Sequence, residues 1–363
     1  MITEARLTIR GLQGRAVTVE LERPVQTSSG EIPVAPLVLI DLETEEGTTG
    51  RAYVFSYTTF ALEPLRLLIS NLGATLEGAA LVPLEIERKL QGMFRLLGPQ
   101  GLAGIAASGV DMAAWDAMAR VNDLPLVELL GGKKKSVPAY GSLRSMRPES
   151  VIEEARELAE LGFRAYKVKI GRGDVKADLE IISALRGAVG DDTRLAVDYN
   201  QSLLVTEALE RVRVLDEEGL YWIEEPTRAD DFVGHARIAE EARTSICLGE
   251  NWWGPHDVQK SLEAGSCDYG MPDAMKIGGV TGWLRTAALA EPRALPLTSH
   301  IFPEISAHLL AVSPTAHRLE YLDLAGPILK EPVRIKSGHA LVSDGPGIGL
   351  EWDEGAVERF LVR

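Results

Sequence analysis

Six acidic or basic side chains recur through the second half of the chain, each where a strand should end. They are Asp198, Glu224, Glu250, Asp273, His300 and Glu320. They follow one another at intervals of 26, 26, 23, 27 and 20 residues, a length that accommodates a strand, a loop, a helix and a return loop. A (β/α)8 barrel holds its reactive groups at the carboxyl ends of its parallel strands. The spacing therefore predicts such a barrel, with one reactive centre at its mouth.

From Val137 onward the sequence alternates between expected strands and helices, as a parallel barrel requires. The eight strand candidates are VPAYGS, RAYKVKI, RLAVDYN, LYWIEE, ICLGE, DYGMPDA, LPLTSH and HRLEY. We assign residues 128–321 to this barrel. Its eighth helix is expected to be weak, because a Gly- and Pro-rich sequence follows Glu320.

The first 127 residues predict a separate α+β capping domain. Four strand-like stretches come first, at residues 2–10, 15–22, 35–43 and 49–55. Helical patterns follow at about 60–72, 84–97 and 103–121. Strands followed by helices form an α+β unit, and residues 322–363 are expected to return to it. The fold class is therefore α/β, a barrel with an N-terminal cap.

The net charge, the apolar content and the cysteines of the chain limit the classes of molecule that it is expected to bind. A net charge of −15 over 363 residues argues against nucleic acid or an anionic membrane as a partner. No apolar run approaches the ~18 residues of a membrane span. The two cysteines, Cys247 and Cys267, lack metal-site spacing and fit a reducing compartment. We expect a cytoplasmic protein that acts on a small molecule.

Two lysines, Lys167 and Lys169, share one face of the second barrel strand, because alternate residues of a strand point the same way. The apolar residues Tyr166, Val168 and Ile170 should pack against the helices, which turns both lysines into the mouth. The alternatives are a salt-bridged pair or a strand end that reaches solvent. A second ammonium nearby lowers the pKa of a lysine, so that it is available as a base near neutral pH.

Three carboxylates end the next three strands and would repel one another unless a cation lay between them. Asp198, Glu224 and Glu250 supply the oxygen ligands that suit Mg2+. We choose Glu224 rather than Glu225 because Glu224 shares the strand face of Trp222. The convergence of these carboxylates predicts a magnesium site.

A second candidate base lies at the end of the seventh strand. There His300 follows one strand after Asp273, and a neighbouring carboxylate fixes the tautomer of an imidazole and raises its basicity. Lys169 and His300 would face each other across the barrel, as two bases on opposite sides of one bound molecule. Glu320 would be a general acid or a hydrogen-bond donor.

These residues resemble the mandelate racemase subgroup of the enolase superfamily. The resemblance covers nearly the whole chain, through APLVLIDL, DMAAWDA, ELGFRAYKVKIG, VDYNQS, WIEEPT, GENWWGP, MPDAMKIGGVTGW, SHIFPEISAHLLA and PTAHRLEYLDLAG. It implies an enolase-like modified barrel with a capping domain. It also implies an isomerase that racemises a 2-hydroxy acid, with mandelate the best guess, through a Mg2+-stabilised enolate.

The resemblance also implies a role for each site residue. The metal ligands would be Asp198, Glu224 and Glu250. Lys169 becomes the base for the S-enantiomer, and His300, paired with Asp273, the base for the R-enantiomer. The remaining polar contacts would be Lys167 and Glu320 at the substrate carboxylate, Asn200 near the α-hydroxyl, Ser142 near the carboxylate and Lys276 as a supporting residue.

The substrate side chain would lie between a flap and an apolar wall. Residues 24–36, PVQTSSGEIPVAP, match the flap of the subgroup in position, with Ser29 and Ile32 over the substrate. Ser28, Ser29 and Glu31 make this flap more polar than an apolar flap for an aryl group. The expected wall consists of Ile32, Phe55, Tyr57, Ile301 and Leu322.

Other functions remain open beside the racemase. An acid-sugar dehydratase on the same fold is the runner-up, because fold alone does not decide the reaction. The Ser-rich flap favours this alternative, whereas the apolar wall opposes it. A non-catalytic metal-binding or scaffold protein would have lost a functional position, and each position keeps the required residue type. The resemblance also implies a homo-oligomer, possibly an octamer.

Overall fold

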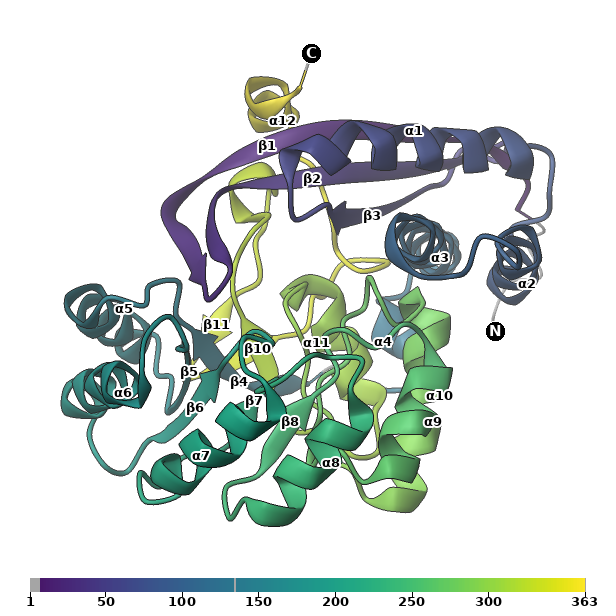
Figure 1. Ribbon diagram of the computed structural model, residues 1–363. Helices are drawn as coiled ribbons and strands as arrows, with labels where there is room; N and C mark the ends of the chain where they lie inside the picture. The colour runs from purple at the N-terminus through teal and green to yellow at the C-terminus, as the bar shows by residue number, and fades with distance from the viewer. Residues whose placement is uncertain (1–6, 134, 363) are drawn as a thin grey trace.

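The N-terminal part of the chain forms a three-stranded antiparallel sheet in the order β1-β2-β3 (Figure 1). Its strands are β1 (Ile9–Thr27), β2 (Gly30–Thr44) and β3 (Thr49–Phe55). The computed structural model describes residues 7–133 and 135–362, so residues 2–6 of the first predicted strand lie outside the described residues. Residues 9–10 and 15–22 of the two predicted stretches belong to the one long strand β1. Its hairpin with β2 reaches down to the barrel (Figure 1).

Three longer helices and one short helix complete the cap. They are α1 (Thr59–Leu76), α2 (Pro83–Met93), α3 (Gly101–Val121) and α4 (Leu126–Leu129). The Ala-rich helix α3 packs unusually close to β3. A Cβ atom at Gly50 would lie 2.0 Å from the carbonyl oxygen of Ala113, so this approach requires glycine. The predicted α+β order is therefore present.

The second part is a closed barrel of parallel strands. These are β4 (Ser136–Ser142), β5 (Ala165–Lys169), β6 (Arg194–Asp198), β7 (Ile223–Glu224), β8 (Ile246–Leu248), β9 (Tyr269–Gly270) and β10 (Leu319–Tyr321). Strand β10 pairs in parallel with β4, where Leu319 lies opposite Ala139. The predicted seventh strand forms only isolated bridges, including one between Asp273 and His300. The barrel fold class is confirmed, with this one position irregular.

The C-terminal segment returns to the cap. Its elements are η2 (Gly326–Ile328), β11 (Ile335–Lys336), β12 (His339–Leu341) and α12 (Glu354–Phe360). A 3-10 turn, η2, thus stands where the eighth barrel helix was expected to be weak. Strand β12 pairs with β4, and the Trp352 indole N–H donates to Asp41 of β2 at 2.8 Å. The residue limits that we assign to the three parts stay a prediction.

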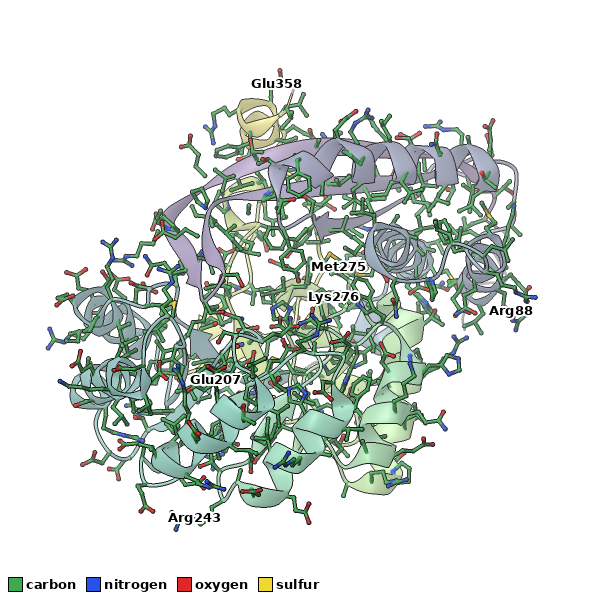
Figure 2. The ribbon with its side chains drawn as sticks, viewed as in Figure 1. Arg88, Glu207, Arg243, Met275, Lys276 and Glu358 are labelled. Carbon is green, nitrogen blue, oxygen red and sulfur yellow. The ribbon has the colours of Figure 1, made fainter. Side chains whose placement is uncertain are left out.

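Buried hydrogen bonds join the cap to the barrel (Figure 2 labels Met275 at this junction). The Phe55 N–H donates to the Met275 Sδ at 3.1 Å, and the Tyr53 hydroxyl donates to Glu304 at 2.6 Å. Asp111 of α3 accepts from the Thr281 N–H and hydroxyl at 3.0 and 2.5 Å. Since buried polar groups are costly when unpaired, these contacts fix the cap over the barrel mouth.

Stability is expected to fall as Asp111 ionises. Burial raises the pKa of Asp111 to about 7, compared with about 3.9 in an unfolded chain. The folded state therefore binds the extra proton, and its advantage is lost as pH rises through about 7. Asp111→Asn should gain about 3 kcal/mol over the natural protein between pH 5 and pH 8, because about two pH units separate pH 5 from this pKa and each is worth about 1.4 kcal/mol. Thermal unfolding of both proteins at the two pH values checks this, and a pH-independent difference would contradict it.

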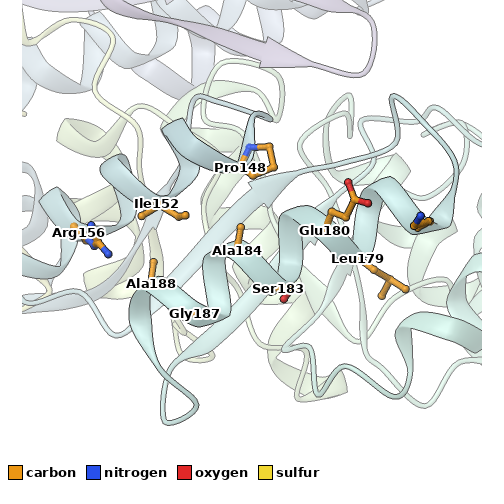
Figure 3. A pocket seen from close by; sticks show the side chains of 10 residues that line it. Pro148, Ile152, Arg156, Leu179, Glu180, Ser183, Ala184, Gly187 and Ala188 are labelled. Atoms are coloured by element: carbon orange, nitrogen blue, oxygen red, sulfur yellow. The ribbon is translucent and has the colours of Figure 1, made fainter.

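Helices surround the barrel on its outer side. They are α5 (Pro148–Glu160), α6 (Val175–Val189), α7 (Val205–Leu215), α8 (Phe232–Glu241), α9 (Pro255–Ala264), α10 (Gly279–Ala290), η1 (Glu291–Arg293) and α11 (Pro303–Val312). A groove of about 560 Å3 between α5 and α6 is lined partly by the small residues Ala184, Gly187 and Ala188 (Figure 3). It lies apart from the predicted site residues. Within the described residues, no helix has the length and apolar character that crossing a membrane would need.

Candidate active site

A cavity of about 390 Å3 opens at the barrel mouth, under the tip of the β1–β2 hairpin. The barrel contributes Lys167, Lys169, Asp198, Asn200, Glu250, His300, Ile301, Glu320 and Leu322 to its lining. The cap contributes Ser29, Ile32, Phe55 and Tyr57, together with the polar flap residue Glu31. The structure thus brings most of the predicted site residues to one cavity between the two parts.

Three buried carboxylates meet at the floor of this region. Asp198 and Glu224 end strands β6 and β7, and Glu250 lies just beyond β8. One oxygen from each lies within 4.8 Å of the others. Burial raises the pKa of Asp198 and of Glu224, because their charged forms lose contact with water. The ammonium of Lys167 lowers both pKa values, and repulsion from the neighbouring carboxylates raises them; the net shift is upward. Three hard oxygen donors at this separation fit a divalent cation.

Glu225 takes a different direction from Glu224. Its two carboxylate oxygens accept from the Asn251 side-chain amide at 3.0 and 2.8 Å. Glu224 instead accepts from Lys167 at 2.6 Å and from the Trp222 indole at 3.2 Å. Glu224 therefore lies with Asp198 and Glu250, and its role as the metal ligand stays a prediction.

Lys167 is a buried cation shared among three carboxylates. Its Nζ lies 2.6 Å from Glu224, 2.8 Å from Glu320 and 3.9 Å from Asp198. Burial lowers the pKa of Lys167, but the charges of these carboxylates outweigh burial and raise the pKa well above its usual value. The prediction that a lysine of this pair has a lowered pKa is therefore wrong for Lys167, because its acidic partners come from other strands.

His300 is held by a carboxylate on each side of its ring. Its Nδ1 lies 2.6 Å from Asp273, and its Nε2 lies 3.2 Å from Glu250. Burial lowers the pKa of His300, but Glu250 and then Asp273 outweigh this and raise it. Asp273 in turn accepts from the Met275 N–H at 2.6 Å, which fixes its carboxylate toward the ring. The predicted His–Asp pair is present.

Glu320 has the contacts of an ionised acceptor. It accepts from Lys167 at 2.8 Å and from the Ile301 N–H at 3.0 Å. Burial raises the pKa of Glu320, but Lys167 and His300 outweigh this and lower it to about 2. Both neighbours donate to Glu320, and its role as an acid or hydrogen-bond donor toward a substrate stays a prediction.

The flap is fixed to the barrel by its tip. The Ser28 hydroxyl donates to the carbonyl oxygen of Tyr199 at 3.1 Å. The Arg172 guanidinium donates to the carbonyl oxygens of Thr27 and Gly30 at 2.8 and 2.9 Å. Ser29 faces the cavity, whereas Ser28 is occupied by the barrel. Sequence reasoning missed Arg172, and a lone arginine after a strand gave no signal.

Aromatic and aliphatic side chains form one wall of the cavity. The rings of Phe55 and Tyr57 lie 4.6 Å apart between centroids, and Ile32, Ile301 and Leu322 line the same space. This wall matches the predicted set. It gives the cavity one apolar side opposite its charged floor.

Several wall and floor residues have a left-handed backbone. The φ angle is 60° at Tyr57, 44° at Asn200, 36° at Glu225, 34° at Ile301 and 49° at Phe302. Non-glycine residues rarely adopt such values, and a β-branched residue such as Ile301 almost never does. Strained residues of this kind cluster at functional sites. In this backbone conformation the N–H of Ile301 points toward the Glu320 carboxylate and donates to it.

Two predicted substrate contacts lie outside the mouth cavity. Ser142 borders a neighbouring cavity that Arg144 also lines, and its buried hydroxyl makes no hydrogen bond within the described residues. Lys276 borders another cavity together with Trp253 and donates to Asn251 at 2.6 Å. Ser142 nevertheless shares the strand face of Tyr140, whose ring lies 5.8 Å from the Lys167 Nζ. The Lys276 ammonium lies 4.7 Å from the ring of Tyr57, which lines the mouth cavity. The substrate contacts of Ser142 and Lys276 therefore stay a prediction.

Both parts of the chain match known families. Residues 10–131 match the mandelate racemase / muconate lactonizing enzyme N-terminal domain, and residues 150–356 match the enolase C-terminal domain-like family. A similar curated protein is a 3,6-anhydro-alpha-L-galactonate cycloisomerase of Streptomyces coelicolor, 34% identical over 349 residues, which are 94% of this chain and 95% of that one.

Solved structures agree in fold. An enolase from Bradyrhizobium, complexed with magnesium and mandelic acid, is 44% identical with a TM-score of 0.96, covering 99% of this chain and 100% of the other. An L-talarate dehydratase from Polaromonas, complexed with Mg and L-glucarate, is 27% identical with a TM-score of 0.89, covering 99% and 98%. The chain therefore belongs to the mandelate racemase/enolase superfamily.

Proposed function

We propose that the protein is a Mg2+-dependent racemase of a 2-hydroxy acid, with mandelate the best candidate substrate. The observation that carries the proposal is that Lys169 and His300 line one cavity, with the three carboxylate strands between their own strands in barrel order. Moving a proton from one face of a carbon to the other needs a base and an acid on opposite sides. This pair supplies both.

The charged floor suits a carboxylate substrate. Mg2+ bound by Asp198, Glu224 and Glu250 would act as a Lewis acid that makes the α-C–H more acidic. The Lys167 ammonium lies beside these ligands and adds positive charge where a substrate carboxylate gains electrons. The Asn200 side-chain oxygen is buried and accepts no hydrogen bond within the described residues, so it is available to an α-hydroxyl.

The two bases then divide the proton transfer. Lys169 takes the α-proton of one enantiomer, and His300 delivers a proton to the opposite face. Asp273 holds the Nδ1 side of His300 at 2.6 Å. The other ring nitrogen, Nε2, lies on the side of Glu250 at 3.2 Å and would exchange that contact for the substrate during proton transfer. The roles reverse for the other enantiomer.

The wall of the cavity favours an apolar substituent on the substrate. Phe55, Tyr57, Ile301 and Leu322 line one side, and burying apolar surface there stabilises an aryl group. The similar Bradyrhizobium protein is complexed with mandelic acid. These observations together support an aryl 2-hydroxy acid.

An acid-sugar dehydratase is the second candidate, and the polar flap favours it. Ser29 and Glu31 line the cavity and offer hydrogen bonds to a polyol. Relatives named as dehydratases and cycloisomerases of sugar acids support this alternative. In that reaction, loss of a β-hydroxyl follows abstraction of the α-proton and yields a 2-keto acid.

The reaction on each substrate class decides between the two. The protein is incubated with Mg2+ and each enantiomer of mandelate, and the optical rotation is followed, with a chelator as control. Sugar acids are tested in parallel with a carbonyl reagent that detects 2-keto acids. The racemase proposal expects both mandelate enantiomers to converge on zero rotation only with Mg2+. Keto-acid formation from a sugar acid without interconversion of any 2-hydroxy acid would overturn it.

The flap residue Ser29 is expected to set the preference between these substrates. Ser29→Val removes a hydroxyl that must be paired when a substrate covers it, and the unpaired group is costly. The ratio of kcat/KM for mandelate over a sugar acid should rise about tenfold. Lactate, whose methyl group is too short to reach the flap, serves as the control and should change little. An unchanged ratio would mean that Ser29 does not contact the substrate.

A further inference from the structure

Lys276 carries a buried positive charge that the proposed proton transfer does not use. Its side chain is 6% exposed, and Figure 2 shows it at the junction of the cap and the barrel. Its ammonium lies 4.7 Å from the ring centroid of Tyr57 and 6.0 Å from that of Trp253. Its hydrogen bond is to the side-chain oxygen of Asn251, at 2.6 Å.

The bond to Lys276 decides which way the Asn251 amide faces. An ammonium group has three donors and no acceptor, so it can bind only the oxygen end of an amide. The nitrogen end must then face the opposite way. There it donates to Glu225 at 3.0 and 2.8 Å and to Glu250 at 3.0 Å. All three contacts would turn into repulsion if the amide rotated by half a turn.

Glu250 is thereby fixed at both of its oxygens. The Oε1 atom accepts from Asn251, and the Oε2 atom lies 3.2 Å from the Nε2 of His300. Loss of a partner that orients a metal ligand in this way typically costs about 10-fold to 100-fold in metal affinity. A rotated Asn251 would leave the Glu250 carboxylate free to turn away from Asp198 and Glu224.

We propose that Lys276 is a positioning residue for the metal site, acting through the Asn251 amide on Glu250. This inference rests on the proposed Mg2+ site. The loop that carries Lys276 also carries Asp273, the partner of His300. One short loop therefore orients both a metal ligand and a catalytic base.

If the charge of Lys276 acted directly on the ion, removing it would change the Mg2+ affinity in the opposite direction from the loss of positioning. Lys276 and Mg2+ repel each other, so removing the ammonium by itself should tighten Mg2+ binding. Loss of the orienting bond should weaken it. The direction of the change in Mg2+ affinity therefore distinguishes positioning from simple electrostatics.

The test measures Mg2+ affinity by isothermal titration calorimetry, without substrate. Lys276→Met is expected to weaken binding by about 10-fold to 100-fold. Asn251→Ala should weaken it similarly, and the double variant should be no weaker than Asn251→Ala alone, because both changes break one chain of contacts. Lys260→Met, on the exposed side of α9, is the matched control and should leave the affinity unchanged.

Unchanged or tighter Mg2+ binding by Lys276→Met would overturn the inference, as would additive losses in the double variant. If Lys276→Met does not fold, Lys276→Gln replaces it, since its amide can still donate to Asn251 without charge and should retain most of the affinity. Loss of affinity in Lys276→Gln equal to that of Asn251→Ala would then count against positioning. Absence of Mg2+ binding by the natural protein would instead overturn the metal site itself.

Discussion

Replacing His300 by Asn is expected to stop racemisation in both directions. An amide can neither take a proton from the substrate nor return one, so each direction loses one of its two steps. General acid–base groups contribute about 10²-fold to 10⁴-fold to a rate, and a loss of this size is expected from either enantiomer of mandelate. Polarimetry from each pure enantiomer measures it.

Lys169→Met should cause a loss of the same size, because the two bases act in series. His339→Asn is the matched control, since His339 is not in the lining of the mouth cavity and its ring is hydrogen-bonded to the carbonyl oxygen of Ser337. It should keep full activity. Racemisation by His300→Asn within tenfold of the natural protein would show that another group serves as the second base.

Removing one metal ligand is expected to abolish Mg2+-dependent turnover. Glu224→Gln keeps the size of the side chain but removes a charge and one strong ligand oxygen, so two carboxylates remain for the ion. Mg2+ affinity should fall by at least about 100-fold, and turnover should fall with it. The change leaves Lys167 paired with Glu320 at 2.8 Å, so the fold is expected to persist.

Glu225→Gln is the matched control for this prediction. Glu225 neighbours Glu224 in the sequence but contacts Asn251 instead of the other two carboxylates. Its variant should lose far less Mg2+ affinity than Glu224→Gln. Circular dichroism and titration calorimetry on both proteins separate loss of metal from loss of structure. The reverse order of effects would mean that Glu225, not Glu224, is the ligand.

The barrel could be predicted because its signal repeats. Reactive side chains at strand ends follow a period set by the length of a β/α unit. The alternation of side chains along a strand was enough to predict that Lys167 and Glu224 point into the barrel mouth. The hairpin of residues 35–55 could be predicted for a similar reason, because its signal is local in the sequence. A turn that contains a glycine lies between two strand-like stretches. The seventh strand was predicted as regular, yet it forms only isolated bridges around Leu297 and His300.

The electrostatics of the site could not be predicted from one strand at a time. Lys169 was considered as the neighbour of Lys167, whereas the charges that raise the pKa of Lys167 come from Glu224 and Glu320, far away in the sequence. The same is true of Glu320, because Lys167 and His300, which lower its pKa, come from other elements. Such shifts depend on tertiary neighbours that periodicity does not reveal.

Backbone strain and loop direction were also hidden. Nothing in the sequence marks Ile301 as a residue with a φ of 34°, because a β-branched residue is the least expected type there. The contact of Lys276 with Asn251 was hidden as well, because the hydrogen bond between them joins two loops that lie 25 residues apart in the sequence.

Proton exchange in D2O tests the two-base account most directly. The α-proton signal of each mandelate enantiomer is followed by NMR with Mg2+ and each single-base variant. The account predicts that His300→Asn exchanges the α-proton of the S-enantiomer alone, through Lys169, and that Lys169→Met exchanges that of the R-enantiomer alone, through His300. Exchange of both enantiomers by either variant, or of neither by both, would contradict the placement of one base on each face of the substrate.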